Sequence, residues 1–324
     1  MRVCIGYTGA TPVRQTFAAV DAAESAGLDG VWSAEHVGLN DAIVPSTAYA
    51  LRTSKLEIGL VGLNADTRHP GVLAMELATL SSLAPGRIRV QVGTGSPTRA
   101  VPIGVTAPRT VRGVETLVSS LRGLLRGEEV TAASEAFRLD GLRLKVEDMP
   151  PVPVDIMAIR PRMTELAARV ADGVSLSAGA SREYLRCRVA EVSAALERHG
   201  RARDEFRISA VALGAFADDM ATARRVMASL AVAFSLGGAP EMRAGLEMPD
   251  QDRLREVLRR EGPAAAGKLL SDATVEGLGL VATPETIGAA VAAYRDTGID
   301  ELVVMPAGEP AGHPRLVRYL AGAR

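Results

Sequence analysis

The sequence predicts a closed α/β barrel of eight parallel strands, a (β/α)8 TIM barrel, as one domain over residues 1–324. Eight short apolar segments alternate with helical segments, which is the order that a parallel barrel requires. These segments are apolar throughout, as expected of strands that are buried on both faces. An open doubly wound sheet has the same alternation and is the structural alternative.

Local signals place the elements along the chain. Val13, Phe17 and Val20 share one face of the first helix, and Gly27 ends that helix. The strands are expected at residues 1–7, 30–34, 56–63, 87–92, 153–158, 173–177, 206–214 and 301–305. The helices are expected at residues 12–26, 45–52, 70–83, 110–125, 161–171, 181–198, 220–236, 284–297 and 313–320.

Two segments interrupt this alternation. Residues from about 128 to 150 are charged and alternating, which predicts a β excursion. Residues from about 237 to 280 are charged and largely helical in pattern. Because strands and helices resume in order after each segment, we interpret both as insertions into a single barrel domain.

Composition excludes several classes of partner. The 37 basic and 38 acidic residues nearly cancel, so we expect no nucleic-acid surface and no electrostatic membrane anchor. The N-terminus lacks the apolar stretch of a signal peptide, and no uncharged run reaches the roughly 20 residues of a membrane span. Cys4 and Cys187 are expected to be reduced thiols. We therefore expect a soluble cytoplasmic protein.

The carboxyl ends of the strands are where such barrels carry their chemistry. The second strand ends in Glu35 and His36, an adjacent carboxylate and imidazole suited to acid–base work. The alternative interpretation is a capping glutamate beside a packed histidine.

The segment after the third strand admits two interpretations. Arg68 and His69 precede a helix start, where backbone N–H groups favour anions. The alternative, which we favour for these two residues, has Thr67 or Asp66 capping the helix and Arg68 paired with Asp66.

Two further turns suit a ligand. Gly93-Thr94-Gly95 lacks the third glycine of a dinucleotide fingerprint, but it lets the backbone approach a flat ring or a polar tail. Arg160 and Arg162 flank the start of the next predicted helix, where they would form a receptor for a phosphate or a carboxylate.

Other chemistries are disfavoured. No lysine falls at the carboxyl end of a predicted strand, so a Schiff-base aldolase would lack its nucleophile. The four histidines show no zinc-binding spacing, and no G-x-S-x-G motif is present.

Four segments together resemble the bacterial luciferase-like family of flavin- and deazaflavin-dependent enzymes. The most specific is residues 53–95, which contain TRHP followed by GTG; residues 22–36, 157–177 and 283–304 match more weakly. The resemblance implies a barrel, usually a homodimer, with a flavin-like ring across the strand ends. The branch that looks most similar uses the deazaflavin coenzyme F-420 for hydride transfer, whereas another branch uses reduced FMN to activate oxygen.

Carried over position by position, the resemblance assigns roles to individual residues. His36 aligns with the active-site histidine, and Glu35 aligns with an acidic residue that contacts the ring. Val61–Gly62 aligns with a non-prolyl cis peptide bond behind the ring. The remaining cofactor-contacting positions are Asn64, Thr94, Gly95, Ser96, Ile159, Arg160, Arg162, Met163 and Ser177.

This chain departs from the two named activities of that branch. Ser96 stands where the sugar-phosphate dehydrogenase has a catalytic glutamate, and Gly6 stands where the methylene-pterin reductase has a functional one. Arg160 replaces a usual glycine. The sequence predicts an oxidoreductase that moves a hydride between coenzyme F-420 and a small organic substrate. The alternatives are an FMN-dependent monooxygenase and a non-catalytic flavin-binding barrel.

Overall fold

The computed structural model describes residues 1–64, 67–95, 104, 110–176 and 178–324. Eight parallel strands form a closed barrel, because the sheet runs in the order β9-β11-β1-β2-β3-β4-β7-β8 and β8 pairs again with β9. This closure confirms the predicted barrel and excludes the open sheet. The barrel strands are β1 (Arg2–Tyr7), β2 (Gly30–Ala34), β3 (Glu57–Leu63), β4 (Ile88–Val92), β7 (Val154–Ala158), β8 (Gly173–Leu176), β9 (Arg207–Phe216) and β11 (Glu301–Pro306).

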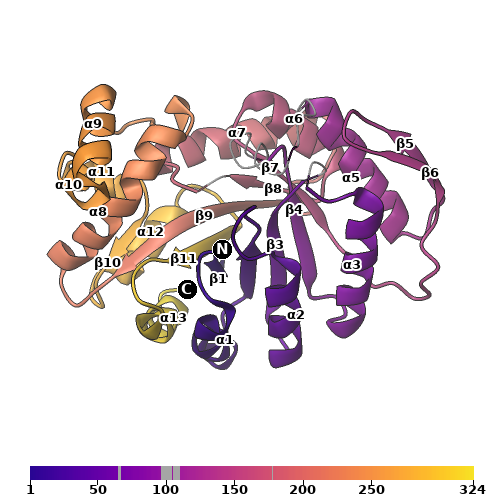
Figure 1. The fold of residues 1–324 in the computed structure, drawn as a ribbon, viewed down its shortest axis with the longest axis horizontal. Coiled ribbons are helices and arrows are strands. Elements are labelled where there is room, and N and C mark those ends of the chain that lie inside the picture. Colours follow the sequence, from indigo (N-terminus) through magenta and orange to yellow (C-terminus); the bar gives the residue numbers. More distant parts are fainter. Residues whose placement is uncertain (65–66, 96–103, 105–109, 177) are drawn as a thin grey trace.

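Helices surround the barrel (Figure 1). The helices that the sequence predicts lie within three residues of their predicted ends. They are α1 (Val13–Ala26), α2 (Ile43–Arg52), α3 (Pro70–Leu83), α5 (Val111–Leu125), α6 (Pro161–Val170), α7 (Arg182–Arg198), α8 (Met220–Gly237), α12 (Ile287–Arg295) and α13 (His313–Gly322). In the described residues no helix is long and apolar enough to cross a membrane.

The first interrupting segment forms the expected β excursion. Strands β5 (Val130–Ala133) and β6 (Arg138–Leu142) pair antiparallel, apart from the barrel sheet. The hairpin lies against the start of α3, because His69 Nε2 is 3.1 Å from the carbonyl oxygen of Arg138.

The second interrupting segment holds a short strand that the sequence pattern did not predict. Its helical part comprises η2 (Pro240–Arg243), α9 (Gln251–Glu261), α10 (Pro263–Gly267) and α11 (Asp272–Gly277), which lie together with α8 in Figure 1. It ends in β10 (Leu280–Ala282), which pairs with the last residues of β9. With only three residues, β10 is too short to show the alternation of side chains by which a strand is recognised in a sequence. The strand exists because β9 runs two residues beyond its predicted end and offers a free edge there.

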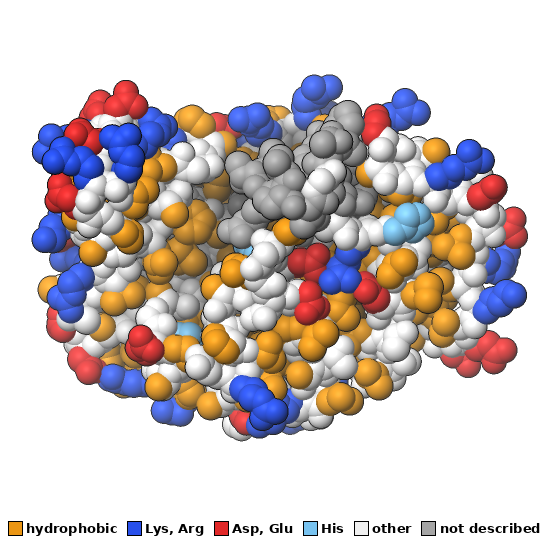
Figure 2. All heavy atoms as spheres, viewed as in Figure 1, with side chains coloured by type: hydrophobic (Ala, Val, Ile, Leu, Met, Phe, Trp, Pro, Cys, Tyr) orange, Lys and Arg blue, Asp and Glu red, His pale blue; other side chains and the backbone are white. Residues whose placement is uncertain are grey.

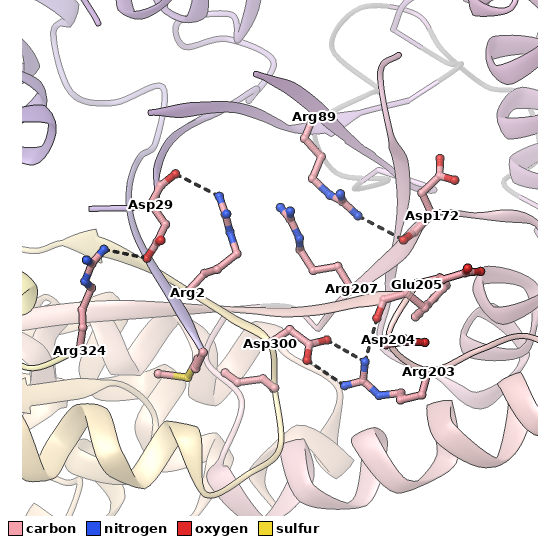
Figure 3. A pocket seen from close by; sticks show the side chains of 13 residues that line it. Arg2, Asp29, Arg89, Asp172, Arg203, Asp204, Glu205, Arg207, Asp300 and Arg324 are labelled. Carbon is pink, nitrogen blue, oxygen red and sulfur yellow. Dashed lines mark hydrogen bonds and ion pairs between the residues drawn. The ribbon is translucent and has the colours of Figure 1, made fainter. Parts of the chain in front are cut away.

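The amino end of the barrel is closed by charged side chains. Six residues at or near the starts of strands form what we call the amino-end ion cluster: Arg2, Glu57, Arg89, Asp155, Arg207 and Glu301. Figure 3 shows three of its arginines together in a pocket of about 590 Å³. The expectation that the strands are apolar throughout is therefore wrong at their first residues.

Apolar side chains fill the space above this cluster. Trp32 is 1% exposed and packs in one apolar cluster with Cys4, Val61, Val211 and Met305 from four other barrel strands. Gly59 makes room for the indole, since a Cβ there would lie 2.0 Å from a Trp32 ring carbon. The barrel interior is thus a packed core in the part of the chain that the structure describes, and the cavities lie at the two ends of the barrel.

Candidate functional site

A cavity of about 800 Å³ opens at the carboxyl ends of β2, β3, β4 and β7. Ten predicted site residues line it: Glu35, His36, Gly62, Asn64, Thr94, Gly95, Ile159, Arg160, Arg162 and Met163. Val61 is 5% exposed and packs in the barrel interior. Ser96 and Ser177 lie outside the described residues. The structure thus brings together residues that are more than 120 positions apart in the sequence.

The end of β2 carries Glu35 and His36 into this cavity. The strand is held in register with β3 through the pairing of Ala34 with Val61. The Glu35 N–H then donates to the Val61 carbonyl at 2.8 Å, one step beyond the ladder. The backbone that presents both side chains is therefore fixed by β3.

A bulge at Gly62 shapes the cavity wall. The register between β3 and β4 shifts between Val61 and Leu63, and Gly62 has a φ of +90°. A Cβ at Gly62 would lie 2.8 Å from the Glu35 carbonyl oxygen, so only glycine fits. The predicted cis bond between Val61 and Gly62 is wrong, since no cis peptide bond occurs in the described residues. The positive φ of glycine produces the kink without one.

A second glycine lies across the cavity, after β4. Gly95 has a φ of +66°, and a Cβ there would lie 2.7 Å from Asn64 Nδ2. Gly93 precedes it, where a Cβ would lie 3.2 Å from the Cβ of Met157. Asn64 and Met157 thus occupy the space that side chains at these two positions would need. Both glycines also line the cavity, where a planar group could contact their backbone.

The turn between β7 and α6 forms the charged end of the cavity. Arg160 occupies the N-cap of α6, and Pro161 begins the helix. The hydroxyl of Tyr184 donates to the Ile159 carbonyl at 2.6 Å and anchors the turn, and burial raises the pKa of Tyr184 to about 12. Arg160 is mostly exposed and bonds Glu241 of η2 at 3.3 Å. The exposed side chains of Arg160 and Arg162 therefore flank the positive end of a helix.

Arg68 contacts two acids that the sequence pattern did not indicate, and its predicted partner Asp66 lies outside the described residues. Its guanidinium hydrogen-bonds Glu35 at 2.8 and 3.0 Å and Glu76 at 2.7 Å. His69 caps α3 with Nδ1, which accepts from the Gly71 N–H at 3.2 Å. The predicted cap by Thr67 or Asp66 is therefore wrong for Thr67, and Asp66 lies outside the described residues.

Sequence reasoning missed part of the cavity wall. Its unpredicted members are Val37, Thr67, Val111, Met157, Ala158, Pro161 and Ala239. Met157 could have been predicted from the sequence, because it is the second-last residue of β7 and the site lies at the carboxyl ends of the strands. Ala239 could not have been predicted, because it belongs to the second insertion, and no sequence pattern shows how this insertion runs over the barrel mouth.

The amino-end pocket is a weaker candidate for the functional site. Arg89 and Asp155 make a bidentate pair at 2.6 and 2.7 Å, and Arg203 pairs with Asp300 at 2.9 Å. Charges that satisfy one another leave little to recognise a ligand. The carboxyl end therefore remains the candidate site.

Comparison with known proteins agrees with this fold. A family model described as luciferase-like monooxygenase matches residues 3–301. A 5,10-methylenetetrahydromethanopterin reductase of Methanolobus tindarius is 26% identical over 314 residues, which are 95% of this chain and 94% of that protein. An F-420-dependent glucose-6-phosphate dehydrogenase of Nakamurella multipartita is 33% identical over 265 residues, which are 78% and 77% of the two chains.

A solved structure shares the fold over its whole length. The coenzyme F-420-dependent tetrahydromethanopterin reductase of Methanopyrus kandleri has a TM-score of 0.84 at 19% identity, with 99% of this chain and 97% of that chain covered. The family match includes six of the eight barrel strands completely and all of β1 except Arg2. The resemblance noted in the sequence is therefore confirmed, and this chain belongs to the luciferase-like monooxygenase family.

Proposed function

We propose that this protein is an oxidoreductase that transfers a hydride between coenzyme F-420 and a small organic substrate. The observation that carries the proposal is the cavity of about 800 Å³, which has a glycine-lined wall at one end and two arginines at the other. The relatives support the cofactor, since their names include this coenzyme.

The residues present fit a planar ring with an anionic tail. Gly62 and Gly95 line the cavity with backbone atoms and no side chain. Asn64 and Thr94 offer polar groups beside them. We assign Val61 a backbone role, because its carbonyl fixes Glu35. Ser96 and Ser177 stay predicted contacts.

The other end of the cavity fits the tail. Arg160 and Arg162 are exposed beside the first turn of α6, at the positive end of the helix dipole. Charge-assisted hydrogen bonds from arginine are about twice as strong as neutral ones. Ile159 and Met163 complete this part of the wall.

The chemistry is divided between ring and protein. When bound, the deazaflavin supplies a ring carbon that gives or accepts a hydride and reacts poorly with oxygen. His36 lines the cavity, where its imidazole can exchange a proton with a substrate oxygen. Glu35 was predicted to contact the ring; because its carboxylate is held by Arg68, we assign it an orienting role beside His36.

The first strand has no carboxylate at the position where the resemblance leads us to expect a functional glutamate, because Gly6 stands there. A Cβ at Gly6 would lie 2.9 Å from Val303 Cγ1 and 3.3 Å from Met305 Cγ. Apolar side chains therefore occupy the space that a glutamate would need. This supports a substrate whose reaction requires no carboxylate at this position.

Titration with the two candidate cofactors tests the proposal. We expect quenching of coenzyme F-420 fluorescence at micromolar protein, with FMN binding at least tenfold more weakly. Tight FMN binding with oxygen uptake would establish the monooxygenase instead. If neither cofactor binds, the result would favour the remaining alternative, a barrel without catalytic activity.

We also propose a homodimer. Apolar residues that are unusually exposed lie on neighbouring helices: Val44 (65%) and Leu51 (68%) on α2, and Val72 (49%) and Met75 (56%) on α3. Figure 2 shows hydrophobic side chains on this face. A patch of this kind favours a protein partner. Sedimentation of Met75→Glu should give a monomer, whereas Val146→Glu, at a 45% exposed control position, should sediment as wild type.

We propose a cytoplasmic location because both cysteines are free thiols. Cys4 is buried and Cys187 is exposed, and both are free. Free thiols are typical of a reducing compartment. Recovery of the protein from an extracellular or membrane fraction of its native cells would contradict this location.

A further inference from the structure

Arg68 connects the wall of the cavity to two helices behind it. Its guanidinium makes three hydrogen bonds to the Glu35 carboxylate, with nitrogen–oxygen distances from 2.8 to 3.3 Å. It also bonds Glu76 at 2.7 Å and lies 3.9 Å from Asp41. The three acids come from the end of β2, from α3 and from the start of α2. One side chain therefore fastens three segments together.

Burial makes these contacts stronger than a surface pair. The side chain of Arg68 is 19% exposed and that of Glu35 is 9% exposed. Burial alone would lower the pKa of Arg68, but the hydrogen bond to Glu35 and the nearby acids raise it. The guanidinium is therefore charged at every working pH, and its planar fork matches the carboxylate.

The clamped carboxylate is adjacent to His36. The Glu35 backbone is already fixed from the other side, since its N–H donates to Val61 and its carbonyl lies against Gly62. The side chain is fixed by Arg68 and by the Ala42 N–H at 3.5 Å. Glu35 is thus held at both ends, which leaves His36 little freedom in how it enters the cavity.

We propose that Arg68 is a positioning residue: by holding the Glu35 carboxylate, it sets the orientation in which His36 faces the cavity. The inference rests on the proposed function, because His36 is the group whose placement matters for turnover. Without Arg68, the carboxylates of Glu35 and Glu76 would face each other without a cation between them. Their repulsion would move the end of β2.

Kinetics of Arg68 variants test the inference. We expect Arg68→Ala to lower kcat about 30-fold while KM for coenzyme F-420 changes less than about threefold, because small misplacements of a catalytic group reduce kcat strongly. Arg68→Lys retains the charge without the fork, and should lower kcat about fivefold. In a Glu35→Gln background, Arg68→Ala should add less than about twofold, because the two residues act as one unit.

Arg52→Ala is the matched control. Arg52 also pairs bidentately with a carboxylate, Asp21, but on the exposed surface of α2. Its removal should leave kcat and KM unchanged. If Arg68→Ala does not fold, Arg68→Lys and its double variant with Glu35→Gln carry the same test. Wild-type kcat in Arg68→Lys, or independent losses from Arg68 and Glu35, would overturn the inference.

A second readout needs no cofactor. With ¹³C-labelled histidine, the four ring signals can be assigned by single substitutions, and we expect the His36 signal to shift in Arg68→Ala but not in Arg52→Ala. An unmoved His36 signal overturns the inference even if activity falls. If the wild type neither binds nor turns over coenzyme F-420, the proposed function fails, and the ring signal alone decides the role of Arg68.

Discussion

The two ends of the barrel use charge and backbone in opposite ways. At the amino end, arginines and carboxylates on the strands pair with one another, as Arg89 does with Asp155 at 2.6 and 2.7 Å. At the carboxyl end, Arg160 is mostly exposed, and glycines with positive φ open a cavity. Paired charges on regular strands close one end, whereas exposed charges on loops leave the other end open to a ligand.

This difference separates stability from activity. Removing one partner of a buried ion pair leaves an uncompensated charge and destabilises the fold. Changing a side chain at the cavity alters a surface that the fold itself does not need. Substitutions at the amino end should therefore lower stability with little effect on turnover, and those at the carboxyl end should do the reverse.

His36→Ala should give the largest effect on activity. We expect kcat to fall about 10²- to 10⁴-fold, because a positioned general acid or base contributes about that much. Affinity for coenzyme F-420 should change less than threefold. His199→Ala, at an exposed histidine paired with Glu165, is the control and should leave kcat unchanged. If His36→Ala turns over at the wild-type rate, His36 is not the general acid or base of the reaction.

Arg89→Ala should give the largest effect on stability. It leaves Asp155, which is fully buried, without its bidentate partner, so we expect a loss of about 3–5 kcal/mol in the free energy of unfolding. Chemical denaturation measures this loss, and kcat per folded molecule should stay within twofold.

The control for this substitution is an exposed pair. Arg169→Ala breaks a pair with Glu115 and should cost less than about 1 kcal/mol. Arg89→Met with Asp155→Leu should recover much of the lost stability, because it removes both buried charges. Equal losses from Arg89→Ala and Arg169→Ala would contradict the interpretation of the amino-end ion cluster.

Two glycine substitutions compare the ends directly. Gly62→Ala and Gly86→Ala both place a side chain at positive φ, 90° and 70°, which costs about 1–2 kcal/mol each. Only Gly62 has the Glu35 carbonyl within 2.8 Å of the new Cβ, whereas nothing lies within 4 Å at Gly86. We therefore expect Gly62→Ala alone to weaken cofactor binding at least tenfold in the fluorescence titration.

A pH series gives the smallest effect. Burial raises the pKa of Glu301 above its ordinary 4.5, and Glu57 adds to this because both carboxylates share Arg2 and Arg207. Between the ordinary and the raised pKa, the folded state holds more protons than the unfolded state. The contribution of Glu301 to stability therefore falls as pH rises through that window.

Glu301→Gln removes this titration. Relative to wild type, its free energy of unfolding should increase with pH from about 4.5 upward and level off above the raised pKa. Denaturation curves at each pH measure the difference. A difference that stays constant over the series would show that Glu301 titrates as it does in the unfolded chain.

The periodic features were predictable from the sequence. The eight barrel strands and the start of α3 at Pro70 follow from apolar runs and helix signals, which act over a few neighbouring residues. The amino-end ion cluster was not predictable. Arg2, Arg89 and Glu301 are ordinary charges in the sequence, and only barrel closure turns them toward one another.

The candidate site divides in the same way. His36 and Arg160 were identified because each directly follows a strand and precedes or caps a helix. The contact of Arg68 with Glu35, 33 positions away, has no local signal, because the sequence shows only nearby acids such as Asp66 as candidate partners. At Gly62 the family resemblance implies a cis bond, whereas the structure forms the bulge through the positive φ of glycine.

Local sequence patterns specify which segments become strands and helices and in which order, and they show that polar residues follow the strands. The tertiary structure alone decided which of those residues meet: that Gly62 lies against Glu35, that Arg68 reaches Glu35 and Glu76, and that the second insertion brings Ala239 to the cavity. The two kinds of feature differ in the sequence separation over which the interactions act. Periodicity and capping are local, whereas side-chain pairing depends on distances that exist only after the sheet has closed.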